Sequence, residues 1–209
     1  MLPEEDLINQ RKKKLEEFRA KGIDPYPYSF DQTDQASDVL EAYKSIKHEE
    51  KARKTHKLAG RLMTIRKMGK ASFAHLQDQS GKIQVYVRED EVGKDAYEVF
   101  QKSDLGDIVG VQGVVFRTKL GEVSLWVKKV GLLAKSVRPL PEKWHGLKDV
   151  EARYRQRYVD LIANPDVKNV FLARCKVISA MREFLDKNGF VEVETPILQP
   201  MYGGAFARP

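Results

Sequence analysis

The stretch LAGRLMTIRKMGKASFAHLQDQSGKIQVYVR (58–88) decides the fold, because apolar and polar residues alternate along it with a period of two. It predicts strands at 58–66, 71–78 and 82–88, joined by turns at KMGK (67–70) and QSG (79–81). The third strand places its isoleucine and valines on one face and Gln84, Tyr86 and Arg88 on the other. We therefore expect a sheet with one apolar face and one face of polar and aromatic side chains.

The residues that follow complete a five-stranded pattern. A short helix is expected at 95–103, a fourth strand at 106–119 and, after a turn at Gly121, a fifth strand at 122–134. Glycines at 106, 110 and 113 fit bends in a small, strongly curved sheet. Five strands with a helix between the third and the fourth are the order of an OB-fold barrel. An SH3-like barrel is the alternative, but it lacks the internal helix.

Helical patterns flank the barrel and make the fold class α+β. Helices are expected at 3–21 and 34–47, and a lysine-rich connection at 44–57. After a proline-containing linker the period returns to 3.6, which predicts helices at 150–162 and from Asn164 to about 188, and then a strand at 190–196. The expected domains are a helical extension (1–57), the barrel (58–135), a linker (136–149) and a second domain that begins at 150.

Composition restricts the classes of function. The net charge of +7 fits either a solvated lysine-rich surface or a protein that binds a polyanion such as nucleic acid. The single cysteine, Cys175, excludes an internal disulfide, so a cytoplasmic protein is expected. Cys175 falls in an expected helix with no histidine at a suitable local spacing, so we expect an inert, buried thiol. The sequence contains no apolar run of the kind that forms a signal peptide or a membrane span. We find no phosphate loop and no dinucleotide fingerprint, and the four histidines do not cluster at metal-ligand spacing. No metal site is expected.

The barrel carries a candidate surface for single-stranded nucleic acid. OB-folds bind such strands on the face of strands two and three, between the loop joining strands one and two and the loop joining four and five. The first loop holds Arg66, Lys67 and Lys70, and the second holds Arg117, Lys119 and Glu122. Phe73 and Tyr86 are expected on the face between them, where a ring can stack on a base. The alternative is that both rings fill the barrel core and the basic side chains are only solvated.

Longer stretches resemble a known family. The order of a long helix, NGFVEVETP (188–196) and ILQPMYGGAFARP (197–209) resembles motif 1 of the class II aminoacyl-tRNA synthetases. RPLPEKWHGLKDVEARYRQRYVDLI (138–162), ETPILQPMYGGAFARP (194–209) and GRLMTIRKMGKASFAHLQDQSGKIQVYV (60–87) are similar to the lysine-specific member, the class II lysine–tRNA ligases. The aspartate and asparagine ligases share the same domain order, but RYRQRY and YGGAFARP resemble the lysine type.

The resemblance implies roles for individual residues. In the family the barrel reads the tRNA anticodon, whose central base is uracil. The matching positions are Phe73 for stacking, Arg66 and Gln84 for hydrogen bonds to base edges, and Glu122 near the neighbouring anticodon bases. Phosphate contacts are expected from Lys67, Lys70 and Lys119. The glycine-rich turn after motif 1, here Gly203, Gly204 and Ala205, is expected to contact the lysine substrate through its backbone.

The resemblance also implies an activity for the family. Class II ligases attach the amino acid to tRNA with ATP and Mg²⁺ through an adenylate, and motif 1 forms a homodimer interface. Motifs 2 and 3, which hold ATP, lie beyond Pro209 in the family, so we expect no catalytic residue within these 209 residues and no aminoacylation by them alone. Two alternatives stay open, which are a stand-alone OB-fold RNA-binding protein and a dimerisation module built on the long helix.

Overall fold

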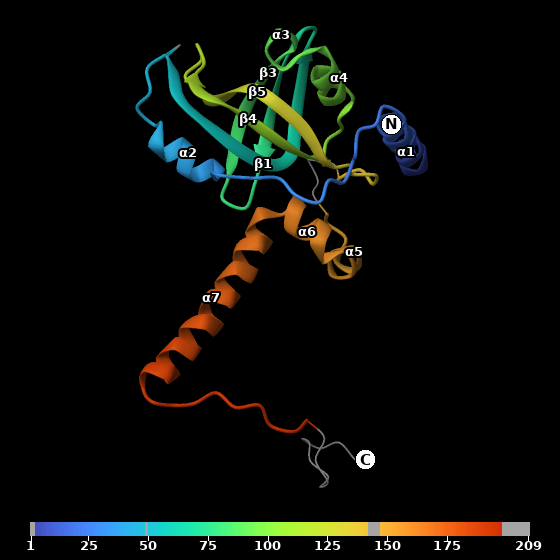
Figure 1. The fold of residues 1–209 in the computed structure, drawn as a ribbon. Coiled ribbons are helices and arrows are strands. Elements are labelled where there is room, and N and C mark those ends of the chain that lie inside the picture. Colours follow the sequence, from blue (N-terminus) through green and yellow to red (C-terminus); the bar gives the residue numbers. More distant parts are fainter. Residues whose placement is uncertain (1–2, 49, 142–146, 198–209) are drawn as a thin grey trace. The chain divides into compact units, whose positions relative to one another are not determined.

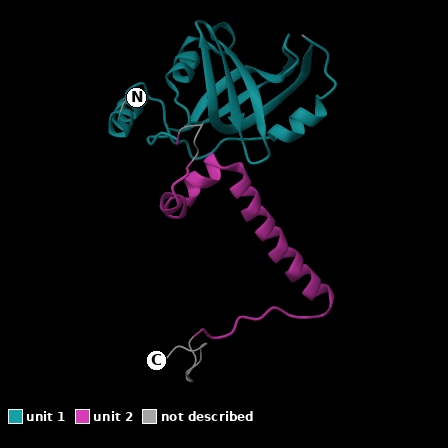
Figure 2. Ribbon diagram, turned by 180° about the vertical axis from the view of Figure 1, so that it is seen from behind, with its two compact units in different colours: residues 1–140 teal, residues 141–209 magenta. Residues whose placement is uncertain are grey.

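The computed structural model describes residues 3–48, 50–141 and 147–197, and the chain divides into two compact units. One unit spans residues 1–140 and the other 141–209 (Figure 2). The first unit contains all the described strands and the second contains helices, so the α+β fold class is confirmed.

Unit 1 is built on a closed five-stranded barrel (Figure 1). Its strands are β1 (Lys51–Met68), β2 (Ala71–Gln77), β3 (Lys82–Arg88), β4 (Ile108–Arg117) and β5 (Val123–Ala134). They follow one another around the barrel as β1-β2-β3-β5-β4, and every pair is antiparallel except β3 with β5. Helices α3 (Glu89–Val92) and α4 (Lys94–Lys102) lie between the third and fourth strands, as the OB-fold order predicts.

The alternation along β2 and β3 sorts the core from the candidate binding face. Ser72, Ala74 and Leu76 of β2 are buried, whereas the residues between them are half-buried. The same holds in β3, where Ile83, Val85 and Val87 are buried. Because the register pairs Phe73 with Tyr86 and His75 with Gln84, the partly exposed side chains form one continuous row across two strands.

The first strand is longer than the sequence pattern predicts. The lysine-rich segment expected as a connection at 44–57 is wrong from Lys51 onward, because β1 already pairs there with β4, for example at Thr55 with Val114. The expected boundary at 57/58 therefore falls inside β1. The first residues of β1 are mostly exposed and several are charged, so the sequence there does not alternate between apolar and polar residues. Helix α2 (Ala36–Ala42) is correspondingly shorter than the expected 34–47.

Helix α1 (Glu4–Ala20) packs on the barrel through Leu15 and Phe18, which are buried. An ion-pair cluster joins this helix to the end of β5. The buried Lys135 Nζ lies 2.7 Å from an Asp104 oxygen and 2.9 Å from each Asp107 oxygen, and Lys14 Nζ lies 2.5 Å from Asp104. These cations lower the pKa of Asp104, although its burial alone would raise it.

One of the glycines of β4 is required by a close approach between strands. A Cβ added at Gly113 would lie 2.1 Å from the carbonyl oxygen of Trp126, a separation that no side chain tolerates. The register of β4 with β5 shifts at this point, between Gln112 and Gly113. The glycine therefore allows β5 to bring Trp126 against the candidate face.

Unit 2 contains α5 (Val150–Arg155), α6 (Arg157–Ala163) and α7 (Pro165–Lys187). The helix expected at 150–162 is interrupted at Gln156, and the two pieces meet at the buried Asp160. This carboxylate accepts hydrogen bonds from Arg153 Nε at 3.0 Å, from Asn164 Nδ2 at 2.6 Å and from Arg157. Burial alone would raise the pKa of Asp160, but Asn164 and the arginines lower it. The cluster fixes the turn from α6 into α7.

The expected strand at 190–196 is wrong, because residues 190–196 have no regular secondary structure. A strand needs a neighbour for its backbone hydrogen bonds, and none of the five described strands pairs with this segment. Gly203, Gly204 and Ala205 lie outside the described residues. Among the described helices, none is long and apolar enough to cross a lipid bilayer.

Candidate nucleic-acid interface

The four residues expected to contact bases line a single cavity. This cavity, called the Phe73 cavity below, has a volume of about 450 Å³ and opens on the outer face of the barrel. Strands β1, β2 and β3 and the turn between β4 and β5 supply its lining, which is Thr64, Ile65, Arg66, Phe73, His75, Gln84, Thr118, Leu120 and Glu122. The barrel therefore brings together residues that are up to 58 positions apart in the sequence, from Thr64 to Glu122.

Phe73 lines this cavity, and one face of its ring is covered by Tyr86. The two ring centroids are 4.4 Å apart and the planes are inclined by 23°, so the rings are stacked. Phe73 is half-buried and is not enclosed in the barrel core. Because Tyr86 covers one face, a base can stack only on the opposite face of Phe73. Tyr86 thus fixes the plane on which a base would lie.

A hydrogen-bonded network crosses the floor of the cavity. Glu122 accepts hydrogen bonds from Gln84 Nε2 at 2.6 Å and from His75 Nε2 at 3.0 Å. The other ring nitrogen of His75 lies 2.8 Å from the Thr64 hydroxyl, and the Ser124 hydroxyl donates to Gln84 Oε1 at 2.8 Å. A carboxylate only accepts hydrogen bonds, so Glu122 holds the Gln84 amide in the orientation that directs its NH2 group toward Glu122.

Arg66 lies opposite Phe73 in the pairing of β1 with β2. Its side chain is exposed and makes no hydrogen bond or ion pair to any other described residue. A guanidinium group in this position can donate hydrogen bonds to a base edge or to a phosphate without first breaking a contact within the protein. Arg66 is thus the uncommitted cation at the rim of the cavity.

The three lysines expected to contact phosphate differ in their surroundings. Lys67 Nζ donates to the carbonyl oxygen of Gln101 at the end of α4, and partial burial lowers the pKa of this lysine. Lys70 is exposed, and its ammonium has no partner among the described residues. Lys119 is also exposed, in the turn between β4 and β5. Lys70 is therefore better placed than Lys67 to reach a phosphate.

The turn between β4 and β5 is held by Arg117. Its guanidinium donates to the carbonyl oxygens of Gly121 at 2.8 Å, Ile46 at 2.6 Å and Lys44. Gly121 has a positive φ of 91°, which an L side chain rarely adopts. Arg117 thus acts on the backbone of the turn that presents Leu120 and Glu122, and its charge is not directed at the cavity.

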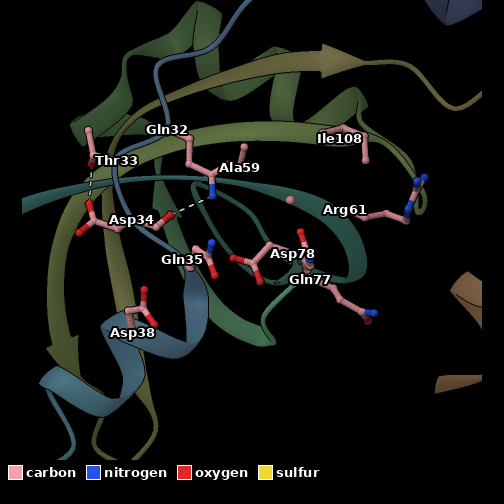
Figure 3. A pocket seen from close by; sticks show the side chains of 12 residues that line it. Gln32, Thr33, Asp34, Gln35, Asp38, Ala59, Arg61, Gln77, Asp78 and Ile108 are labelled. Carbon is pink, nitrogen blue, oxygen red and sulfur yellow. Dashed lines mark hydrogen bonds between the residues drawn. The ribbon is translucent and has the colours of Figure 1, made fainter. Parts of the chain in front are cut away.

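A larger cavity, of about 660 Å³, lies elsewhere on unit 1, between α2, the segment before it, the middle of β1 and the end of β2 (Figure 3). Asp34, Asp38 and Asp78 lie around it, and Arg61 is the cation in its lining. The balance of charge there disfavours a phosphate backbone. Asp78 is moreover committed, because its carboxylate accepts hydrogen bonds from the backbone of Ala36 at 2.7 Å and from Ser80 at 2.7 Å.

Side chains that could bind a metal ion do not cluster in ranges 3–48, 50–141 and 147–197. No cluster of three or more His, Cys, Asp or Glu side chains there could hold a metal ion. Cys175, expected to be an inert buried thiol in a helix, does lie in α7, but its side chain is exposed in the unit as described. The expected burial of Cys175 is therefore wrong for this unit taken by itself.

The sequence pattern missed several residues that the barrel brings to the interface. Thr64 and Leu120 line the Phe73 cavity, and Trp126 contacts Tyr86 with ring centroids 5.1 Å apart. Lys51 Nζ lies 3.4 Å from the centroid of the Trp126 ring. The parallel pairing of β3 with β5 joins Tyr86 to Trp126, and no local periodicity reveals such a long-range pair. The one available signal was the single aromatic residue of the fifth strand.

Comparisons with known proteins place the chain in a family. Residues 56–133 match the model of the OB-fold nucleic acid binding domain, and residues 149–209 match that of the class II tRNA synthetases (D, K and N). Curated lysine–tRNA ligases match nearly the whole chain at 52–56% identity. The chain belongs to the class II lysine–tRNA ligase family.

Three relatives show how far the similarity extends. The lysine–tRNA ligase of Carboxydothermus hydrogenoformans is 54% identical over 98% of this chain, that of Oceanobacillus iheyensis 56% over 95%, and that of Bacillus subtilis 52% over 98%. The chain spans 41% of the length of each of these three relatives. The OB-fold recognised from the strand pattern is thereby confirmed, and so is the resemblance to lysine–tRNA ligases.

Proposed function

We propose that this chain supplies the anticodon-binding part of a lysine–tRNA ligase, an enzyme that attaches lysine to tRNA through a lysyl-adenylate. The observation that carries the proposal is that Arg66, Phe73, Gln84 and Glu122 line one cavity on an OB-fold. An aromatic ring, an amide, a guanidinium and a carboxylate within one cavity are the groups that bind an unpaired base by stacking and by its edges.

The geometry supports a uracil in the Phe73 cavity. The base stacks on the free face of Phe73, since Tyr86 covers the other face. Uracil carries an N–H donor between two carbonyl acceptors, so an amide such as that of Gln84 can pair with it. Arg66, which has no other partner among the described residues, donates to a base carbonyl or to the adjoining phosphate. Cytosine has an acceptor at the ring position where uracil has its donor, which would leave one polar group of the site unpaired.

The remaining features of the family enter as proposals for the whole protein. ATP and Mg²⁺ would supply the activated phosphate to which the carboxylate of lysine is joined, and no cluster of metal ligands lies among the described residues. Gly203, Gly204 and Ala205 would contact the lysine substrate through their backbone. A homodimer through α7 is supported by its exposed apolar side chains, such as Val177, Met181 and Phe184. The protein would act in the cytoplasm.

The alternative function is a stand-alone OB-fold RNA-binding protein without ligase activity. Both functions use the Phe73 cavity, so binding alone does not separate them. The match of residues 149–209 to the class II synthetases favours the ligase, because an RNA-binding protein has no use for that segment. A lysine-dependent exchange of pyrophosphate into ATP by the whole protein, with no exchange on other amino acids, is expected only of the ligase.

The anticodon role is tested by titrating the chain with two RNA stem-loops. One carries the lysine anticodon, and the other differs only by cytosine in place of the central uracil. We expect the uracil loop to bind about 10-fold to 100-fold more tightly, from one changed base contact. Equal dissociation constants for the two loops at the same salt concentration would contradict the proposal.

A further inference from the structure

The carboxylate of Glu122 accepts hydrogen bonds from two side chains, and only one of them has a role in the proposed function. Gln84 of β3 donates to one carboxylate oxygen at 2.6 Å, and His75 of β2 lies 3.0 Å from the other. His75 has a second partner, because its other ring nitrogen lies 2.8 Å from the hydroxyl of Thr64 in β1. Thr64 and His75 both line the Phe73 cavity, and neither is among the residues assigned to base contact.

The pairing of the strands brings these side chains together. Thr64 pairs with His75 between β1 and β2, and His75 pairs with Gln84 between β2 and β3. Gln84 in turn pairs with Ser124 of β5, whose hydroxyl donates to the Gln84 oxygen at 2.8 Å. Three successive pairings therefore place four residues in one row across four strands, called the Thr64–Ser124 row below. Glu122 reaches the row from the turn that precedes β5.

The carboxylate determines the direction of every hydrogen bond along the Thr64–Ser124 row. A carboxylate only accepts, so Nε2 of neutral His75 carries the proton toward Glu122, and Nδ1 carries none. Nδ1 therefore accepts from the hydroxyl of Thr64. On the other side, Gln84 donates to Glu122 through its nitrogen and accepts from Ser124 through its oxygen. Both ends of the row are hydroxyl groups, and every bond between them points toward the same carboxylate.

Glu122 needs two donors to stay in this position, because its side chain is 48% exposed. Water competes for an exposed carboxylate, so a single hydrogen bond to it adds little net free energy. Donors from two different strands restrict the carboxylate to one place between them. Without His75, the amide of Gln84 would be the one side chain of the row left to hold Glu122, and both side chains could move together.

We propose that Thr64 and His75 are positioning residues for base recognition in the Phe73 cavity. They act through Glu122, whose place sets the orientation of the Gln84 amide, and they do not touch the base. This role rests on the proposed anticodon function and extends its specificity-determining residues to β1 and to a second residue of β2. With its nitrogen on Glu122 and its oxygen on Ser124, the amide keeps one N–H and one oxygen lone pair free. The edge of uracil offers the matching acceptor and donor.

The discrimination ratio tests this role. It is the dissociation constant of the stem-loop with a central cytosine divided by that of the stem-loop with the central uracil. The variants are His75→Leu, which removes both ring nitrogens, and Thr64→Val, which removes the hydroxyl and keeps the shape. We expect the ratio to fall about fivefold in His75→Leu and about twofold in Thr64→Val, with a smaller loss of affinity for the uracil loop. Thr64→Ser keeps the hydroxyl and should retain the ratio of the parent chain.

Two controls separate positioning from a general loss of structure. Thr55→Val makes the same change in the same strand, at an exposed residue outside the lining of the cavity, and should leave the ratio unchanged. In a chain that already carries Glu122→Ala, the change His75→Leu should have no further effect, because the two side chains act as one unit. Thermal unfolding of each variant establishes that it is folded at the temperature of the titration.

The outcomes distinguish the positioning role from the anticodon function. If the parent chain does not bind the uracil loop more tightly than the cytosine loop, the proposed function fails and the positioning role fails with it. If the parent chain discriminates and both His75→Leu and Thr64→Val discriminate equally well, the Phe73 site stands and the positioning role is wrong. An effect of His75→Leu that persists in full beside Glu122→Ala would mean that His75 touches the base itself, which would also overturn the proposal.

Discussion

The carboxylate of Glu122 lies 2.6 Å from the side-chain nitrogen of Gln84, and both residues line the Phe73 cavity. The orientation of the Gln84 amide is therefore set before any ligand binds, because Glu122 accepts from its nitrogen and Ser124 donates to its oxygen. A side chain held in this way loses little freedom when it binds a base, which favours both affinity and discrimination between bases.

Removal of Glu122 should reduce discrimination between bases more than affinity. In the Glu122→Ala variant the Gln84 amide can turn over, so it can offer its donor or its acceptor to the base. The ratio of dissociation constants for the cytosine and uracil stem-loops should fall several-fold, which corresponds to about 1 kcal/mol for one hydrogen bond. The change Glu16→Ala controls for charge, because it removes one carboxylate from the exposed face of α1. A similar loss of discrimination in both variants would contradict the role of Glu122.

Phe73 should contribute stacking energy and little stability. Its side chain is half-buried on the outer face, so the change Phe73→Ala is expected to weaken stem-loop binding by about 1–3 kcal/mol, or roughly 5- to 150-fold. The melting temperature should change far less than it would for a core residue such as Val85, which is fully buried. The measurement is a binding titration together with thermal unfolding of the same preparation. Unchanged affinity would show that no base stacks on this ring.

Lys67 and Lys70 should differ in how they affect the salt dependence of binding. The ammonium of Lys67 is engaged with the Gln101 carbonyl, whereas Lys70 has no described partner. Lys70→Ala should therefore reduce the slope of log K against log salt by about one, the amount expected for one lost phosphate contact. Lys67→Ala should leave the slope nearly unchanged and serves as the matched control from the same hairpin of β1 and β2. If Lys67→Ala reduced the slope more than Lys70→Ala, the Lys67 ammonium would have to leave the Gln101 carbonyl when RNA binds.

The fold should lose stability in acid partly through Asp78. Burial alone would raise the pKa of this carboxyl group, but hydrogen bonds from Ser80 and from the backbone of Ala36 and Gly81 lower it below its usual range. The folded state therefore binds this proton less readily than the unfolded chain. The resulting stabilisation is complete above the unfolded pKa of about 3.9 and is lost as the pH falls through the lowered folded pKa.

The Asp78→Asn variant tests this pH dependence. It should be less stable than the parent at pH 7, and the difference in the free energy of unfolding should shrink between about pH 4 and pH 2. Asp95→Asn is the control, because Asp95 is exposed and its carboxylate has no hydrogen bond to a described residue. A difference that stays constant down to pH 2 would exclude a lowered pKa for Asp78.

Gly113 should tolerate no side chain. The change Gly113→Ala places a methyl group against the Trp126 carbonyl, which is backbone and cannot move alone, and should cost about 1–3 kcal/mol of stability. Gly131→Ala is the matched control, since Gly131 also lies in the barrel but has open space where its Cβ would be. Thermal unfolding of both variants decides the point. Equal melting temperatures would mean that β4 and β5 can separate locally.

The alternation at 58–88 predicted the barrel well, because each strand there has one buried and one open face that a period of two reveals. The same reasoning placed Phe73 and Gln84 on the open face, where the structure has them. It failed at Lys51, because an exposed, charged strand end carries no periodic signal. It also failed at 190–196, since an alternating segment becomes a strand only when another strand pairs with it. Trp126 and Leu120 could not be found locally, because barrel closure alone brings them to Phe73.

The coverage of one face of Phe73 by Tyr86 has a consequence for the shape of RNA that can bind. A ring with a single open face ends a column of stacked bases, so it cannot insert into a continuous stack. The strand must turn its backbone away at this nucleotide, and a straight single strand or a duplex would first have to be bent. A hairpin loop already makes such a turn, so this barrel should prefer tight loops over linear RNA of the same sequence.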